Sequence, residues 1–149
     1  MGKIKQSLLR LKSKTEYTLS TVVVKTTPIG ARRNKILKEL KDKYKGQRCF
    51  IIGNGPSLTV SDLESLKDEV TFASNRIFKI FDETDWRPDY YGVFDESVFC
   101  SDEIIEKINA FDCKAKFFRE QGWSVSRKIK NSCYIHTWYS RKYLDEPEF

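Results

Sequence analysis

Histidine is nearly absent from this sequence, because His136 is the only one among 149 residues. The four cysteines, at positions 49, 100, 113 and 133, form no CxxC motif and no other close pair. Structural zinc sites combine Cys and His ligands at short spacing, so we predict no metal site. The cysteines instead indicate reduced, mostly buried thiols of a cytosolic protein.

Long apolar runs are also absent. No stretch approaches the ~20 consecutive apolar residues of a membrane-spanning helix. The N-terminus has neither the compact apolar stretch nor the small-residue cleavage site of a secretory signal. A chain of 149 residues with 40% hydrophobic and 13% aromatic residues is typical of a folded globular protein, and we predict a cytoplasmic location.

The net positive charge comes from the first third of the chain. Residues 1–47 hold 13 Lys and Arg against 3 Asp and Glu, whereas residues 48–149 hold 14 against 18. The net charge of +6 therefore belongs to the N-terminal segment. Because the remainder is mildly acidic, we predict no nucleic-acid partner.

Residues 1–14 have the pattern of a basic amphipathic helix. Ile4, Leu8 and Leu11 recur at helical spacing, with five Lys and Arg residues around them. One interpretation is contact with an anionic membrane surface, which would place the protein peripherally at the inner membrane face. The other is a solvated helix that packs one face on its own domain.

Residues 17–24 fit either a strand or a continuation of this helix. Residues 26–30 predict a break in the chain, and residues 31–45 predict a second helix that Gly46 ends. We therefore divide the chain into a basic helical N-terminal segment, residues 1–45, and a second domain, residues 46–149.

The second domain alternates between strands and helices. Short apolar segments predict strands at 49–52, 69–74, 90–94, 114–118 and 132–137. Helices are expected at 62–67 and 102–111, and a short amphipathic turn is expected at 77–81. Such alternation predicts a parallel sheet with right-handed crossovers. The predicted fold class is α/β: a Rossmann-like, mostly parallel sheet with helices on both faces, preceded by the basic helical segment.

A glycine-rich loop, GNGPS at residues 53–57, follows the strand at 49–52. Its glycines permit positive φ angles and let an anion approach the backbone. A helix start is predicted after it, because Ser61 and Glu64 have capping-box spacing, and the N–H groups of a helix end favour negative charge. The loop predicts a phosphate or nucleotide cradle; the alternative is a plain turn between strand and helix.

Polar residues follow three of the predicted strands. In parallel α/β sheets, ligands bind beyond the carboxyl ends of the strands. Gly53 and Gly55 would admit a phosphate, and Asn54 and Asn75 offer amide groups to a ribose or base. Asp95 would accept a hydrogen bond from a hydroxyl or hold Mg²⁺. The structural alternatives are an Asx turn at Asn75 and a helix or turn cap at Asp95.

Several familiar signatures are missing. GNGPSL lacks the third glycine of GxGxxG, and the second strand ends in Asn75 rather than in the ribose-binding acid of NAD enzymes. The Gly-Lys-Ser/Thr of a Walker loop is absent. Ser57 has no histidine partner in its sequence context, and a lone residue such as His136 near an apolar strand is more often structural than a general base. The catalytic residues are therefore unknown.

The sequence nevertheless resembles a known family in GQRCFIIGNGPSL at 46–58, FASNRI at 72–77, and TDWRPDYY at 84–91 followed by Asp95. These segments are similar to bacterial proteins of the MptE-like 6-hydroxymethylpterin diphosphokinase domain family, which are often found among surface-polysaccharide genes. The GNGPSL loop and Asn75 also resemble the bacterial sialyltransferases of capsule and lipooligosaccharide synthesis. In those enzymes the loop and the Asn contact the cytidine nucleotide of CMP-sialic acid.

The resemblance covers residues 28–118 and implies a Rossmann-like nucleotide-binding fold. On this basis the nucleotide pocket would consist of Gly53, Asn54, Gly55, Pro56, Ser57 and Asn75. Asp95 stands where the sialyltransferases tend to have an Asn. Members of these families continue into a second half, so residues 46–149 are expected to be an incomplete domain, the N-terminal half of such a protein.

The resemblance implies a CMP-sugar type glycosyltransferase-like protein of surface polysaccharide synthesis, with a nucleotide-sugar donor and a glycan acceptor as partners. The loop would stabilise the departing CMP phosphate while a base, which these residues do not supply, deprotonates the acceptor hydroxyl. One alternative is a Mg²⁺-dependent 6-hydroxymethylpterin diphosphokinase-like enzyme that transfers pyrophosphate from ATP. Another is a non-catalytic nucleotide-binding module.

Overall fold

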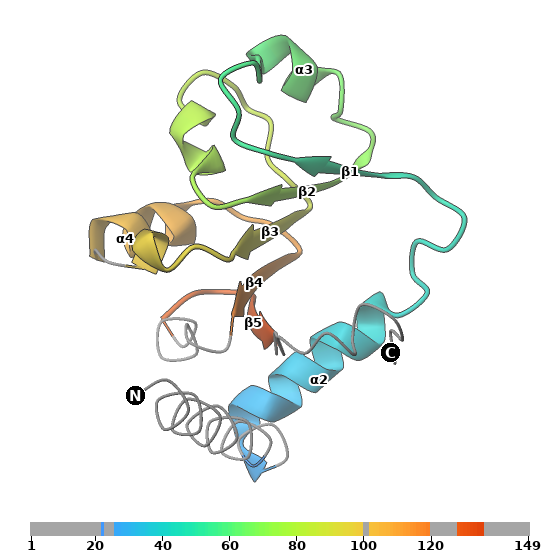
Figure 1. Cartoon of the computed structure of the whole chain (residues 1–149). Coiled ribbons are helices and arrows are strands. Elements are labelled where there is room, and N and C mark those ends of the chain that lie inside the picture. Colours follow the sequence, from blue (N-terminus) through green and yellow to red (C-terminus); the bar gives the residue numbers. More distant parts are fainter. Residues whose placement is uncertain (1–21, 23–25, 100–101, 120–127, 136–149) are drawn as a thin grey trace, which may run out of the picture. The chain divides into compact units, whose positions relative to one another are not determined.

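The structure is a computed structural model that describes residue 22 and residues 26–99, 102–119 and 128–135 (Figure 1). The chain divides into two compact units, Met1–Lys43 and Tyr44–Phe149. The predicted helix at 1–14 and His136 lie outside the described residues, as does the segment 17–24 apart from Val22. Within the described part of the chain, no helix has the length and apolarity needed to cross a membrane.

Helix α2 (Pro28–Leu40) belongs to the first unit. Thr27 is its N-cap, since the Thr27 side chain accepts a hydrogen bond from the Gly30 N–H at 3.3 Å. Proline fits the first turn because its missing N–H is not needed there. The predicted break is present at Thr27, whose extended backbone (φ −112°, ψ 154°) separates helical Thr26 from α2, but α2 starts at Pro28 rather than at residue 31. The helix also ends short of residue 45, and Asp42 follows it with a φ of 59°, which Asp tolerates.

The second unit contains a five-stranded sheet whose strands are all parallel and lie in chain order (Figure 1). The strands are β1 (Cys49–Ile52), β2 (Val70–Ser74), β3 (Tyr90–Val93), β4 (Ala115–Arg119) and β5 (Ser132–Ile135). The helices between them are α3 (Val60–Glu64), the 3₁₀-helices η1 (Ile77–Ile80) and η2 (Glu96–Phe99), and α4 (Asp102–Ala110). The predicted α/β, Rossmann-like parallel sheet is confirmed. The described helices of this unit lie on one face of the sheet rather than on both as predicted, because right-handed crossovers between strands in chain order place their helices on the same side.

One face of the sheet carries the main core of this unit. The strands contribute alternate side chains to it, and the helices that follow β1, β2 and β3 pack against the same face. Among the most buried members of the cluster are Ile52, Ala73, Tyr91 and Phe118 from the strands, with Leu63 of α3, Phe78 of η1 and Ile108 of α4. Full burial of one such large apolar side chain contributes about 1.5–3 kcal/mol to folding.

The other face of the sheet carries a row of stacked aromatic rings. The ring of Phe72 lies 5.9 Å from that of Phe117 and 6.4 Å from that of Phe94, both in stacked geometry. A Cβ atom at Gly92 would lie 2.6–2.9 Å from ring atoms of Phe72 and Phe94. The two rings can therefore pack directly on the backbone of β3 only because residue 92 is a glycine.

Strand β1 is an edge strand with one open face. Ile52 is buried in the core, whereas Ile51 is 84% exposed and Cys49 is exposed. The prediction of a buried strand with a buried cysteine is wrong at these two positions, because a short apolar run does not indicate whether both faces are covered. Cys113 is half-buried and Cys133 is buried, while Cys100 lies outside the described residues.

We expect the cysteines to differ strongly in their rate of alkylation. Only the thiolate reacts, and burial raises the pKa of the Cys113 thiol to about 11. With N-ethylmaleimide at pH 7.5, Cys49 should be modified first, Cys113 slowly and Cys133 only after unfolding. The rate at Cys113 should keep increasing above pH 9. Mass spectrometry of timed, quenched digests measures each site, and equal rates at all three would contradict the arrangement of β1.

Candidate functional site

The candidate site is the edge of the sheet where β1, β2 and β3 end. These strands are parallel neighbours, so their carboxyl ends lie at one edge. The residues that follow the three strands are the loop at 53–57, the corner at Asn75 and Arg76, and Asp95. Side-chain hydrogen bonds connect the three ends in sequence and fix their relative positions.

Asn54 connects the end of β1 to the end of β2. Its side-chain Nδ2 donates a hydrogen bond of 2.8 Å to the carbonyl of Ser74, the last residue of β2. This bond uses the amide predicted to contact a nucleotide. Asn54 therefore holds the glycine-rich loop against β2, and its Oδ1 is an acceptor without a partner among the described residues.

Asn75 connects the end of β2 to the end of β3. Its Oδ1 accepts hydrogen bonds from the N–H groups of Phe94 at 3.2 Å and Asp95 at 3.4 Å. Its own N–H donates to the Gly92 carbonyl at 2.8 Å, and the Tyr91 hydroxyl donates to the Asn75 carbonyl. Asn75 adopts a φ of 51°, a left-handed conformation that Asn tolerates better than most residues. Its structural role is thus visible, whereas contact with a nucleotide stays a prediction.

Asp95 starts the 3₁₀-helix η2. Its Oδ1 accepts a hydrogen bond of 2.9 Å from the Ser97 N–H. The hydrogen bonds to the backbone and side chain of Ser97, aided by the nearby Arg76 cation, lower the pKa of the Asp95 carboxyl. The carboxylate is therefore ionised at neutral pH. The turn cap that the sequence allowed is present, and one oxygen is already engaged in it.

The glycine-rich loop is open on its outer side. All five of its residues are exposed, and the Leu58 N–H donates to the Gly55 carbonyl at 3.1 Å, which closes a turn with Pro56 at its second position. The backbone N–H groups of Asn54, Gly55 and Ser57 have no acceptor among the described residues. Neither glycine has a positive φ, so this loop does not use the left-handed conformation that glycine permits. The space around Gly53 is empty within 4 Å of a built Cβ.

The helix after the loop does not serve as the expected anion site. Helix α3 has five residues and begins at Val60, and its capping box joins Thr59 to Asp62 rather than Ser61 to Glu64. Asp62 accepts from the Thr59 N–H at 2.9 Å, and Thr59 accepts from the Asp62 N–H at 3.2 Å. The first turn is thus capped by its own side chains and carries a carboxylate, so anion binding would rest on the loop backbone.

Two arginines border the same edge of the sheet. Arg76 follows Asn75 directly, and its charge lowers the pKa of Asp95. Arg119 ends β4, and its NH1 donates a hydrogen bond of 3.4 Å to the Phe94 carbonyl. Arg119 was not predicted as a site residue from the sequence. Its position beside the end of β3 depends on the pairing of β3 with β4, which the local sequence does not indicate. Both guanidinium groups add positive charge near the site.

The arrangement offers backbone N–H donors, amide groups and two cations, with one ionised carboxylate. This set suits a phosphate-containing ligand with hydroxyl groups. Among the described residues there is no group of three or more potential metal ligands, and no histidine. In comparisons with known proteins, no protein-family model, curated protein or solved structure matches this chain.

Proposed function

We propose that this edge of the sheet binds the nucleotide of a CMP-sugar type donor, and that the chain is a glycosyltransferase-like protein of surface polysaccharide synthesis. The observation that carries the proposal is the exposed loop at 53–57, in which the backbone N–H groups of Asn54, Gly55 and Ser57 have no acceptor in the described part of the chain. It lies beside the amides of Asn54 and Asn75, which hydrogen bonds hold in place. The resemblance of GNGPSL and Asn75 to the sialyltransferases supports the choice of a cytidine nucleotide.

In glycosyl transfer the leaving nucleotide carries the developing negative charge. Backbone N–H groups that point at a phosphate oxygen stabilise this charge without any proton transfer. The loop at 53–57 would supply such donors, and Arg76 would add a cation at the next strand end. The base that deprotonates the acceptor would come from residues other than those described here.

A Mg²⁺-dependent diphosphokinase-like reaction is the second candidate. The observation in its favour is Asp95, whose lowered pKa keeps the carboxylate available to a cation. In that reaction Mg²⁺ would neutralise the phosphates of ATP, while the same loop would hold them. The two candidates thus share the loop and differ in their need for metal and for Asp95.

Calorimetric titration of the full chain with CMP and ATP, each with and without Mg²⁺, distinguishes them. Binding of CMP that does not require metal supports the glycosyltransferase-like proposal. Binding of ATP that needs Mg²⁺ and weakens in Asp95→Ala supports the diphosphokinase-like alternative. If neither nucleotide binds under any condition, the proposed site is wrong.

Replacing Gly53 with alanine should weaken CMP binding at least tenfold without destabilising the protein. The added methyl group meets no protein atom within 4 Å and would occupy the space in front of the loop backbone. Because φ at Gly53 is not left-handed, the free energy of unfolding should stay unchanged or rise by up to ~1 kcal/mol.

Gly46→Ala provides the matched control. Gly46 lies at the other end of β1 with a φ of 80°, so alanine there should lower the free energy of unfolding by ~1 kcal/mol. CMP affinity should not change in this variant. Calorimetry and urea unfolding measure both properties, and normal CMP binding by Gly53→Ala would rule out a phosphate in front of this residue.

A further inference from the structure

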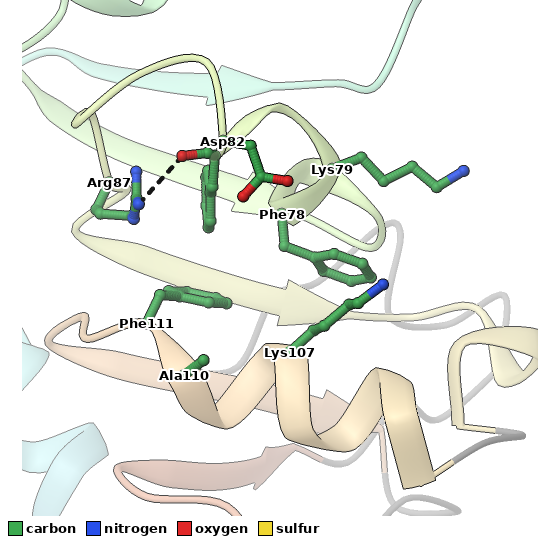
Figure 2. A pocket seen from close by; sticks show the side chains of 8 residues that line it. Phe78, Lys79, Asp82, Arg87, Lys107, Ala110 and Phe111 are labelled. Carbon is green, nitrogen blue, oxygen red and sulfur yellow. Dashed lines mark hydrogen bonds between the residues drawn. The ribbon is translucent and has the colours of Figure 1, made fainter.

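A cavity of about 500 Å³ lies away from the strand ends, on the helix-covered side of the sheet (Figure 2). It opens between η1 with its following loop and the second half of α4. None of the residues assigned to the nucleotide site lines it. Its volume falls within the ~300–1,000 Å³ range of sites that enclose small ligands.

The inner wall of this cavity is aromatic. Phe78 and Phe111 are 8% and 6% exposed, and the ring of Phe81 meets that of Phe111 edge to face at 5.0 Å. These rings also belong to the core or pack against it, so their positions are fixed by the fold. Only a small part of the Phe78 and Phe111 rings is exposed, so a flat apolar group would contact these exposed parts rather than stack on a whole ring.

Arg87 forms a fixed part of the rim. Its NH1 donates hydrogen bonds of 2.7 Å to the carbonyls of Thr84 and Trp86. Its NH2 donates to the Phe81 carbonyl at 3.3 Å, the bond drawn as a dashed line in Figure 2. Its guanidinium lies 4.3 Å from the centre of the Phe81 ring. Little conformational entropy would be lost when a ligand contacts such a preorganised cation.

The charges at the rim are mainly positive. Lys79 and Lys107 line the cavity together with Arg87, and Asp82 is the one carboxylate among its lining residues. Figure 2 shows Asp82 and Arg87 on the η1 side and Lys107 across from them on α4. Lys107 also pairs with Glu103 at 2.8 Å on the same helix. The Lys79 ammonium has no partner among the described residues.

We propose that this cavity binds a small ligand with a flat apolar body and an anionic group. The body would lie against the aromatic wall, and the anion would face Lys107 and Arg87 at the rim. Charge complementarity selects this chemistry, because three cations and one carboxylate surround an apolar floor. The proposal does not depend on the nucleotide site, since the two sites share no residue.

Three naphthalene probes of matched shape test the proposal: 2-naphthalenesulfonate, 2-naphthylmethanol and 2-naphthylmethylammonium. Titration of the ¹⁵N-labelled full chain should show saturable shifts in residues of η1 and the second half of α4. The sulfonate should bind at least tenfold more tightly than the ammonium, with the alcohol between them. Equal affinity for all three, or shifts confined to β1 and its exposed face, would overturn the proposal.

Two variants and a control locate the probe. Ala110→Phe fills the cavity from α4 and should abolish sulfonate binding. Lys107→Glu, at a side chain 55% exposed, should fold normally and weaken the sulfonate at least tenfold. Lys67→Glu is the matched control, because Lys67 is 53% exposed and likewise pairs with a nearby glutamate, Glu64 at the end of α3. Unchanged binding in Lys107→Glu, or equal losses in Lys107→Glu and Lys67→Glu, would refute the site.

Discussion

Replacing Lys116 with methionine should lower the free energy of unfolding by about 2–4 kcal/mol. Lys116 is 1% exposed, and its Nζ donates hydrogen bonds of 2.6 Å to the Ile108 carbonyl and 2.7 Å to the Phe111 carbonyl. Both acceptors belong to the end of α4 or follow it directly. A buried carbonyl left without a donor costs about 1–3 kcal/mol, and methionine would leave two of them.

The lysine thus caps a helix from inside the protein. The C-terminal carbonyls of a helix have no partner within it, and a cation there interacts favourably with the helix dipole. The ammonium also lies 4.5 Å from the centre of the Phe111 ring. Burial lowers the pKa of Lys116, which shows that the charged ammonium has a desolvation cost. The two hydrogen bonds and the ring contact offset this cost and fix the position of the end of α4 relative to β4.

The change in the free energy of unfolding is measured by urea unfolding that is monitored by circular dichroism. Lys130→Met is the control, because Lys130 is exposed in the same part of the unit, and its free energy of unfolding should change by less than ~0.5 kcal/mol. Lys116→Arg tests the geometry, since a guanidinium is larger and should also destabilise. A Lys116→Met protein as stable as the control would show that water or another group satisfies the two carbonyls.

Replacing Asn75 with alanine should remove CMP binding and lower the free energy of unfolding by about 2–3 kcal/mol. The side chain accepts from two N–H groups at the end of β3, and each lost hydrogen bond costs about 1 kcal/mol. The φ of 51° adds a further cost of about 1 kcal/mol for alanine. The ends of β2 and β3 should then separate, and the side-chain amide of Asn75 should no longer lie beside the loop at 53–57.

Further substitutions separate these contributions. Asn75→Gly keeps the backbone conformation, so it should be about 1 kcal/mol more stable than Asn75→Ala while binding CMP no better. Asn75→Asp keeps the acceptor for both N–H groups and should retain most of the stability. It would place a negative charge beside the phosphate and should therefore bind CMP at least tenfold more weakly.

Asn131 offers a matched control at the opposite edge of the sheet. It adopts a φ of 54°, and its Nδ2 donates to the Cys113 carbonyl at 3.2 Å. Asn131→Ala should lose stability to a similar extent as Asn75→Ala but keep full CMP affinity. Calorimetry measures the CMP affinity of both variants, and urea unfolding measures their stability. An equal loss of CMP affinity in both variants would show that the loss in Asn75→Ala results from lower stability alone.

The strands and their order of appearance were predictable from the sequence. Segments such as the run ending at Ile52 are short, apolar and bounded by turn residues, so the local pattern carries the information. The three polar strand ends followed from the rule that parallel strands share a carboxyl edge. The positions of Asn54, Asn75 and Asp95 at one edge are therefore a consequence of local pattern and general topology.

Other features depend on contacts between distant segments. Nothing near Lys116 indicates that its ammonium meets the end of α4, because lysine is usually exposed. The capping box was misplaced by two residues because Thr59–Asp62 and Ser61–Glu64 have the same spacing. The cavity lined by Phe81 and Lys107 likewise forms only where η1 and its following loop pack beside α4. The periodicity of neither segment predicts this packing.

The order of the strands has a consequence for how the sheet assembles. Each strand pairs with the next one along the chain: Cys49 aligns with Val70, Tyr90 with Ala115, and Lys116 with Ser132. Every pairing in β1–β5 thus joins positions about 20 residues apart, which keeps the entropy lost on loop closure small. As the ribosome releases the chain, each strand can add to the edge left by the one before it.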